Sequence, residues 1–203
     1  MPRVNICVIF MHMEKHILRK QTRAARDAMP EELILRKSAK IVSVFKDHFF
    51  PMLKTPKCAM IYLSTQSEVK TSGLIRYLSE KGVEIYVPCV DDGMIIPVKY
   101  TKGCALSRGA YKIKEPVKKI KPRTPRCISL VIIPGIAFDA KGNRVGFGKG
   151  FFDHFLKKLP SSAIKTALAF EKQIVRTVPS DRHDVKMDYI ITEDRIINCG
   201  GSK

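Results

Sequence analysis

Several features that mark other protein classes are missing from this 203-residue chain. No two of its six cysteines lie within five residues of each other, so there is no C-x-x-C zinc half-site or redox pair. The apolar run over residues 4–11 is interrupted by Asn5 and is too short to span a membrane. Only Arg3 precedes that run and no small-residue cleavage site follows it, which argues against a secretory signal. We therefore expect reduced thiols and a cytoplasmic location.

Acidic residues are also scarce. The chain has 19 Asp and Glu against 37 Lys and Arg, a formal net charge of +18, which attracts nucleic acid, acidic lipid or a polyanionic small molecule. Half of the excess falls within residues 99–126, where ten basic residues outnumber the single acidic residue, Glu115, by nine. Three prolines and a loss of periodicity predict that these residues, here named the basic segment, form a solvated excursion outside the core.

The rest of the composition is that of a globular protein, with 45% hydrophobic and 28% charged residues, and the length suits one domain spanning residues 1–203. Apolar periodicity predicts helices over residues 14–28, 30–51, 72–81 and 151–159. Short apolar runs predict strands over residues 58–63, 83–87, 95–98, 128–133, 165–170, 187–192 and 195–198. This alternation predicts a three-layer α/β/α sandwich around a mixed, largely parallel sheet.

The first predicted helix carries basic residues at spacings of four, four and three, which places them on one helical face: Lys15, Arg19, Arg23 and Arg26. Such a face either binds an anion or is simply solvated.

Most of the residues suited to chemistry lie in residues 134–153, PGIAFDAKGNRVGFGKGFFD, here named the glycine loop. Its alternating glycines let the backbone turn tightly and approach a ligand without a Cβ in the way: Gly146, Gly148 and Gly150. The following helix would offer free N–H groups to an anion, and Arg144 and Lys149 add positive charge. The P-loop and dinucleotide-binding patterns both fail here. The loop is either another kind of phosphate cradle or a plain glycine turn, and its charge favours the cradle.

Asp153 lies in the first turn of that helix, close to where phosphates would bind. A carboxylate repels a triphosphate unless a cation lies between them, and Mg²⁺ is usually held by one or two carboxylates together with phosphates. The alternative is that Asp153 only complements the helix dipole.

The glycine loop, with its lead-in at residues 132–135 and its exit at residues 150–153, resembles the signature of the 5-formyltetrahydrofolate cyclo-ligases, also called 5,10-methenyltetrahydrofolate synthetases. Lys15 and Arg19 resemble the N-terminal K-x-x-x-R of that family, and residues 63–68, LSTQSE, resemble its substrate segment. Further matches follow between residues 167 and 193. The resemblance runs from about residue 15 to residue 195 and is weak only across the basic segment.

The resemblance implies a fold similar to that of sugar-phosphate isomerases and coenzyme A transferases. It also implies a reaction in which MgATP drives the conversion of 5-formyltetrahydrofolate to 5,10-methenyltetrahydrofolate, with release of ADP and phosphate. Phosphorylation of the formyl oxygen makes it a good leaving group, and N10 then attacks the activated carbon. Phosphoryl transfer needs positioning and charge neutralisation more than a protein nucleophile.

Site residues follow from the resemblance position by position. The expected ATP contacts are Lys15, Arg19, Arg144, Val145, Gly146, Phe147, Gly148, Lys149, Gly150, Phe151 and Phe152. The expected folate contacts are Leu63, Glu68, Phe147, Gly148, Lys149, Gly150 and Phe151. Arg144 and Lys149 are the expected catalytic residues, and Asp153 and Asp188 are the expected Mg²⁺ ligands.

The chain departs from the family pattern in three places. Phe151 and Phe152 stand where Tyr-Tyr is common, which keeps packing but removes any hydroxyl hydrogen bond. Phe147 stands where Tyr or Arg is frequent. Residues 1–12 have no clear counterpart, and we expect them to be a dispensable extension.

Two other functions compete with this interpretation. The net charge of +18 also suits a nucleic-acid-binding module, but the basic segment has only Tyr100 and Tyr111 for base stacking, and no known binding motif appears. A polyglutamylated folate is itself a polyanion that would use the same field. An ATP-independent enzyme related to sugar-phosphate isomerases is the other alternative, and ATP dependence distinguishes it. We expect no nucleic-acid or membrane partner, and a monomer or weak dimer.

Overall fold

A computed structural model describes residues 6–65, 67–109, 113–122 and 124–200, with side chains from residue 13 onward. Its main feature is a seven-stranded sheet in the order β11-β10-β9-β6-β1-β2-β3. The strands are β1 (Cys58–Ile61), β2 (Glu84–Asp91), β3 (Met94–Lys99), β6 (Ile128–Ile133), β9 (Ile164–Leu168), β10 (Tyr189–Ile191) and β11 (Ile196–Asn198). The five central strands are parallel, and the edge strands β3 and β11 are antiparallel to their neighbours. The predicted mixed, largely parallel sheet is confirmed.

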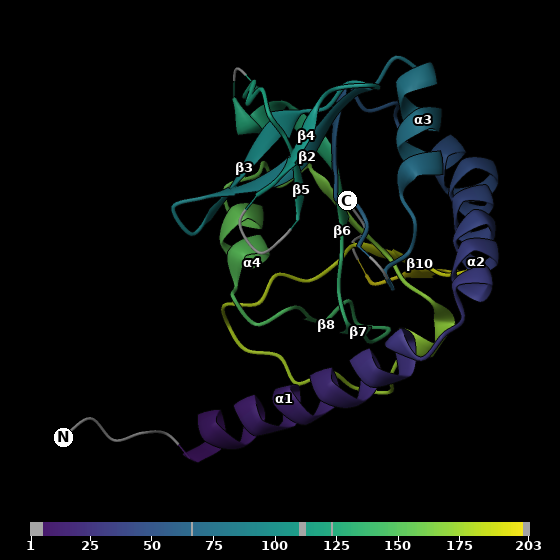
Figure 1. The fold of residues 1–203 in the computed structure, drawn as a ribbon. Helices are drawn as coiled ribbons and strands as arrows, with labels where there is room; N and C mark the ends of the chain where they lie inside the picture. Colours follow the sequence, from purple (N-terminus) through teal and green to yellow (C-terminus); the bar gives the residue numbers. More distant parts are fainter. Residues whose placement is uncertain (1–5, 66, 110–112, 123, 201–203) are drawn as a thin grey trace.

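Helices cover both faces of the sheet (Figure 1). On one face, α2 (Glu31–Val44) and α3 (Ser72–Glu80) pack against side chains such as Ile132 of β6. On the other face, α4 (Phe151–Leu156) packs against Val131 and Ile133 of the same strand. Successive side chains of a strand point to opposite faces, so a continuous apolar run is buried on both sides. The predicted three-layer arrangement is therefore confirmed.

The chain after α2 continues through a π-helical turn (Phe45–Phe49) and a 3-10 turn (Phe50–Met52) that bury Phe45 and Phe49. The predicted helix over residues 30–51 is thus one helical segment with three kinds of winding. The helix predicted over residues 151–159 is shorter, since α4 ends at Leu156.

The first helix, α1 (Ile6–Asp27), is longer than predicted and runs below the sheet, across a small sheet of β7 (Ala137–Phe138) and β8 (Arg144–Val145) (Figure 1). Leu18 packs there against Ala137, Val145 and Val178. A 3-10 turn (Glu171–Gln173) lies against the same helix, and Lys172 Nζ donates to the Ala25 carbonyl at 2.8 Å. Among the residues described, no helix is both long and apolar enough to cross a bilayer.

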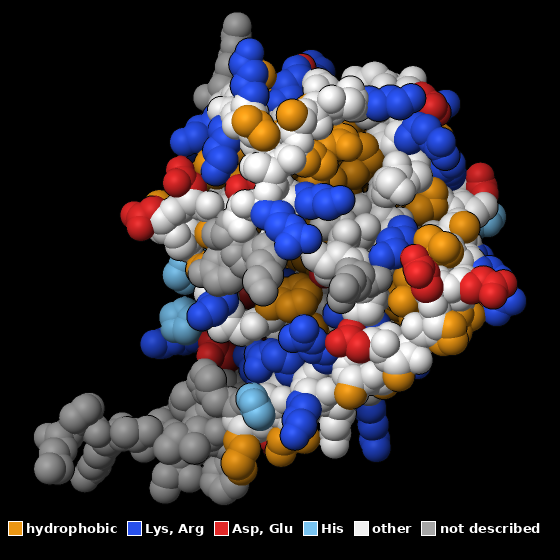
Figure 2. Space-filling model, in the orientation of Figure 1, with side chains coloured by type: hydrophobic (Ala, Val, Ile, Leu, Met, Phe, Trp, Pro, Cys, Tyr) orange, Lys and Arg blue, Asp and Glu red, His pale blue; other side chains and the backbone are white. Residues whose placement is uncertain are grey.

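The basic segment contains structure that its composition does not predict. Strands β4 (Leu106–Arg108) and β5 (Lys114–Pro116) form a two-stranded antiparallel sheet, and a 3-10 turn (Pro125–Cys127) precedes β6. Its one acidic residue, Glu115, is only 3% exposed and accepts from Val90 N at 3.0 Å. Most described basic side chains of the segment are exposed, as predicted, and Figure 2 shows Lys and Arg spread over this face of the molecule.

Truncation of α1 tests whether residues 1–12 are needed for folding. Residues 1–5 lie outside the described chain. A chain that begins at Met13 keeps the Lys15–Asp184 ion pair and the Leu18 contacts. We expect its thermal midpoint, followed by circular dichroism, to stay within about 2 °C of the full-length value. A chain that begins at Lys20 loses these contacts and should melt clearly lower. If the chain that begins at Met13 has a thermal midpoint as low as that of the chain that begins at Lys20, the first twelve residues support the fold.

Candidate active site

Most of the expected site residues follow the carboxyl ends of three neighbouring parallel strands; Asp188 is the exception, since it directly precedes β10 and bonds to Lys165 near the start of β9. Residues 62–68 follow β1, the glycine loop follows β6, and residues 169–173 follow β9. In parallel α/β sheets, ligands bind in the crevice beyond these strand ends. Here α1 lies at this end of the sheet, against β7, β8 and the 171–173 turn (Figure 1).

The glycine loop begins with a tightly held hairpin. Asp139 accepts from the backbone N–H groups of Lys141, Asn143 and Val178 at 2.9–3.0 Å. Gly142 turns with φ of 81°, and a Cβ there would lie 2.4 Å from the Met187 carbonyl oxygen, so only glycine fits. The hairpin therefore delivers Arg144 and Val145 to fixed positions before the flexible glycines begin.

Arg144 and Asp153 form an ion pair inside the loop. Arg144 Nη2 donates to Asp153 Oδ1 at 3.0 Å, and the two side chains are 4% and 19% exposed. Arg144 Nη1 also donates to the Pro134 carbonyl at 3.2 Å, and the guanidinium lies 5.7 Å from the Phe152 ring centroid. The pair joins β8 to the first turn of α4, so it closes the glycine loop into a ring.

The outer part of the loop is open to solvent. Phe147 is 47% exposed, and Gly148, Lys149 and Gly150 are exposed as well. Gly148 and Gly150 adopt φ values of 100° and 68°, a region that other residues rarely enter. Lys149 forms no ion pair with any residue that the structure describes. Its charge is thus available to a ligand.

Helix α1 supplies two of the predicted basic residues. Arg19 Nε donates to the Gly146 carbonyl at 2.9 Å, and the guanidinium carbon lies 3.7 Å from where a Cβ of Gly148 would be. Lys15 Nζ pairs with Asp184 at 2.5 Å. The sequence prediction assigns Asp184 no chemistry, because it reads as a turn residue, and its pairing with Lys15 spans 169 residues. A groove of about 350 Å³ runs along this face of α1 and is lined by His16, Arg19, Lys20, Arg23, Ala24 and Asp27.

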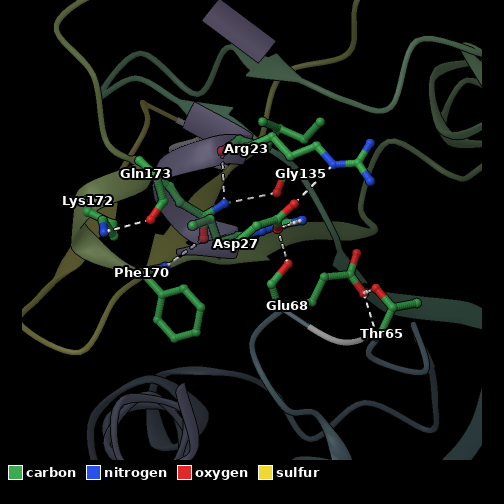
Figure 3. A network of polar contacts seen from close by, with 12 residues as sticks. Arg23, Asp27, Thr65, Glu68, Gly135, Phe170, Lys172 and Gln173 are labelled. Atoms are coloured by element: carbon green, nitrogen blue, oxygen red, sulfur yellow. Dashed lines mark hydrogen bonds and ion pairs between the residues drawn. The ribbon is translucent and has the colours of Figure 1, made fainter. Parts of the chain in front are cut away.

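The segment after β1 holds the expected folate contacts. Glu68 is 6% exposed, and its Oε2 accepts from Thr65 N at 2.7 Å and from Thr65 Oγ1 at 2.9 Å. Leu63 is half-buried and packs against the core. Ser67 Oγ donates to Asp27 of α1, which connects this segment to the helix (Figure 3). Burial of Asp27 alone would raise its pKa, but the Ser67 hydrogen bond and the charges of nearby arginines outweigh it and lower that pKa.

The two expected Mg²⁺ ligands have different cationic partners. Asp153 Oδ1 receives both Arg144 and the Val185 N–H, while Asp188 Oδ2 receives both the N–H and Nζ of Lys165 at 2.8 Å. Each carboxylate keeps its second oxygen without a hydrogen bond from the described residues. No group of three or more His, Cys, Asp or Glu that could hold a metal occurs among those residues. One or two carboxylates together with phosphate and water are the usual ligands of Mg²⁺, so the free oxygen of Asp153 in the glycine loop suits such a cation, with Asp188 as a second ligand only if it reaches the same point.

Comparison with known proteins supports the resemblance seen in the sequence. The model of the 5-formyltetrahydrofolate cyclo-ligase family matches residues 11–193. The 5-formyltetrahydrofolate cyclo-ligase of Mus musculus is 27% identical over 201 residues, covering 93% of this chain and 98% of the mouse protein. A probable 5-formyltetrahydrofolate cyclo-ligase of Caenorhabditis elegans is 31% identical over 150 residues, covering 68% of this chain and 73% of the relative.

Solved structures show the same similarity. The 5,10-methenyltetrahydrofolate synthetase of Aquifex aeolicus superposes with a TM-score of 0.80 at 30% identity, covering 93% of this chain and 94% of that protein. The enzyme of the same name from Mycoplasma pneumoniae shares the fold, with a TM-score of 0.70 at 24% identity, covering 88% of this chain and 98% of that protein. Fold, glycine loop and family match thus agree, and the chain belongs to the 5-formyltetrahydrofolate cyclo-ligase family.

Proposed function

We propose that this chain converts 5-formyltetrahydrofolate to 5,10-methenyltetrahydrofolate at the expense of ATP, the reaction of its family. The observation that carries the proposal is the glycine loop held by the Arg144–Asp153 pair and joined to Arg19 of α1. The loop presents its exposed backbone and the side chain of Lys149, and the basic helix α1 lies beside it. Such a site suits a polyphosphate, since phosphoryl transfer depends on positioning and charge neutralisation.

Lys149 and Arg19 are the side chains that we assign to the phosphates, together with Lys15 and the backbone of residues 144–152. Lys149 is exposed and unpaired among the described residues, and Arg19 keeps donors beyond the one it gives to Gly146. Because α4 has only six residues, its end contributes less than the side chains do. Arg144 is engaged by Asp153, so we assign it mainly to holding the loop and that carboxylate in place.

Mg²⁺ fits this site, and Asp153 and Asp188 are the residues that would hold it through their unengaged oxygens. When bound, the cation supplies neutralisation of phosphate charge that the carboxylates alone would oppose. The role of Asp153 is then to place that positive charge beside Lys149 and Arg19.

The folate is assigned to the side of the crevice that Glu68 and Leu63 form after β1, with Phe147 and Phe151 as apolar walls. Glu68 has one oxygen engaged by Thr65 and one available for the N–H donors of a pterin ring. Held there, the formyl oxygen would face the terminal phosphate of ATP. Transfer of that phosphate creates the leaving group, and N10 of the folate closes the ring.

The cysteines take no part in this chemistry. The five that the structure describes are all free thiols, which supports the cytoplasm as the location. Burial raises the pKa of the Cys58 thiol and that of the Cys199 thiol to about 11, so both stay protonated and are poor nucleophiles.

The direct test is the absorbance of the methenyl-folate product, followed with 5-formyltetrahydrofolate in the presence and absence of ATP. The proposal predicts product only when ATP is present. Product without ATP would favour a relative of the sugar-phosphate isomerases. No product under either condition, together with salt-sensitive RNA binding, would favour the nucleic-acid module.

Replacing Lys149 tests the phosphate assignment. For Lys149→Ala we expect kcat/KM for ATP to fall about 10- to 100-fold, the range for loss of one charged hydrogen bond. The thermal midpoint should not change, because Lys149 is exposed. Lys157→Ala is the matched control: it removes an exposed lysine at the far end of α4 and should leave turnover unchanged. Wild-type turnover of Lys149→Ala at limiting ATP would refute the assignment.

Asp153→Asn separates the metal role from the ion pair. Loss of the carboxylate should raise the Mg²⁺ concentration needed for half-maximal turnover, and excess Mg²⁺ should partly restore activity. It also leaves Arg144 buried without its partner, so we expect stability to fall by about 3–5 kcal/mol in denaturant unfolding. The double variant Arg144→Met with Asp153→Asn should recover part of that stability but none of the Mg²⁺ response. An unchanged Mg²⁺ dependence in Asp153→Asn would contradict the metal role.

We also propose that the basic segment favours folates with several γ-glutamates, because each adds a carboxylate. The measurement is KM for mono- and pentaglutamate substrates, for wild type and for a variant with Lys118, Lys119 and Lys121 changed to Gln. Exposed pairs contribute about 0–1 kcal/mol each, so the preference should be graded. It should weaken in 1 M salt, where the screening length is about 3 Å. Equal KM values for both substrates at low salt would exclude the idea.

A further inference from the structure

The arginine at the end of α1 differs from its neighbour on the same helical face. Arg26 belongs to the predicted basic face, yet it is only 3% exposed, whereas Arg23 is exposed. A charged side chain is almost never buried to this degree unless it is paired. This makes the partners of Arg26 informative.

Those partners are few. The one ion pair described for Arg26 joins Nη2 to Asp27 Oδ1 at 3.6 Å, which is too long for a hydrogen bond. Its Nε is buried and has no hydrogen-bond partner among the described residues. Asp27 is itself shared with Arg23 and Ser67. A guanidinium carries five N–H donors, so Arg26 keeps donor capacity that the described residues do not use.

Arg26 lies next to the segment that carries Glu68. Ser67, which adjoins Glu68, bonds to Asp27, which adjoins Arg26, and Figure 3 shows the end of α1 and this segment converging. Both charges also act on the buried Tyr62: burial and then Glu68 raise the pKa of that phenol, and Arg26 opposes the rise. The Arg26 and Glu68 charges are thus both within electrostatic reach of Tyr62.

Arg26 and Glu68 can each form further hydrogen bonds, Arg26 as a donor and Glu68 as an acceptor. Both described bonds to Glu68 end on Oε2, which leaves Oε1 to accept. Arg26 can only donate. The pterin ring of a folate has the complementary edge, since its N3–H and 2-amino donors stand beside the 4-oxo acceptor.

We propose that Arg26 is a specificity-determining residue that recognises the 4-oxo group of the pterin while Glu68 accepts from the adjacent N–H donors. This inference rests on the proposed function, because it takes the folate as the substrate. It predicts that the site distinguishes a 4-oxo pterin from a 4-amino pterin. The amino group of the latter would place its N–H donors against the N–H donors of the guanidinium.

The test compares the dissociation constants of 5-formyltetrahydrofolate and its 4-amino-4-deoxy analogue, measured by calorimetry on the full chain. Wild type should favour the 4-oxo compound by about tenfold or more, as expected for one hydrogen bond to a charged group. In Arg26→Met the ratio of the two constants should fall at least about fivefold but not to one, because the 4-amino compound also lacks the N3–H that Glu68 accepts, while KM for ATP stays unchanged. Arg23→Met, which removes an exposed arginine that shares Asp27, should keep the wild-type ratio.

Arg26→Lys covers the case in which the methionine variant does not fold. It keeps the buried charge but loses the forked donor geometry, so its preference for the 4-oxo compound should fall at least about threefold. A wild-type ratio in either folded variant would overturn the inference and mark Arg26 as structural. If wild type neither binds nor converts 5-formyltetrahydrofolate, the proposed function itself fails; if it does both and only the ratio is unaffected by Arg26, the function stands.

Discussion

The ion pair between Arg144 and Asp153 is the contact on which the rest of the site depends. It ties the last residues of the β7–β8 hairpin to the first turn of α4, across a stretch that holds three glycines and an exposed lysine. Asp153 also accepts from Val185, which brings in the segment whose Asp184 holds Lys15 of α1. Breaking a buried pair of this kind usually costs about 3–5 kcal/mol, so the ends of the loop are held together by a strong local constraint.

The same arrangement explains why α1 matters for function. The helix lies against the β7–β8 hairpin beyond the parallel strands and places Arg19 against the loop carbonyl at Gly146. Its other end meets the segment after β1 through Asp27 and Ser67. One helix thus contacts both the expected phosphate side and the expected folate side of the site.

Features that depend on a local sequence pattern were predicted correctly. The apolar run at β6 forms as expected over Ile128–Ile133, and the glycine loop follows it as expected. The two-residue strands β7 and β8 were beyond prediction, because two residues have no periodicity. The burial of Arg26 was not predicted and Asp184 was left without a role, since both depend on parts of the chain far away in sequence. Local spacing identifies a helical face but does not say what will cover it.

The central claim is that ATP phosphorylates the formyl oxygen, and an oxygen label follows that atom directly. With 5-formyltetrahydrofolate carrying ¹⁸O in the formyl group, the account predicts that the released phosphate contains one ¹⁸O, seen by mass spectrometry. The label moves because the bond from formyl carbon to oxygen breaks, while the new bond to phosphorus is retained. Unlabelled phosphate, with the ¹⁸O found in water, would contradict it.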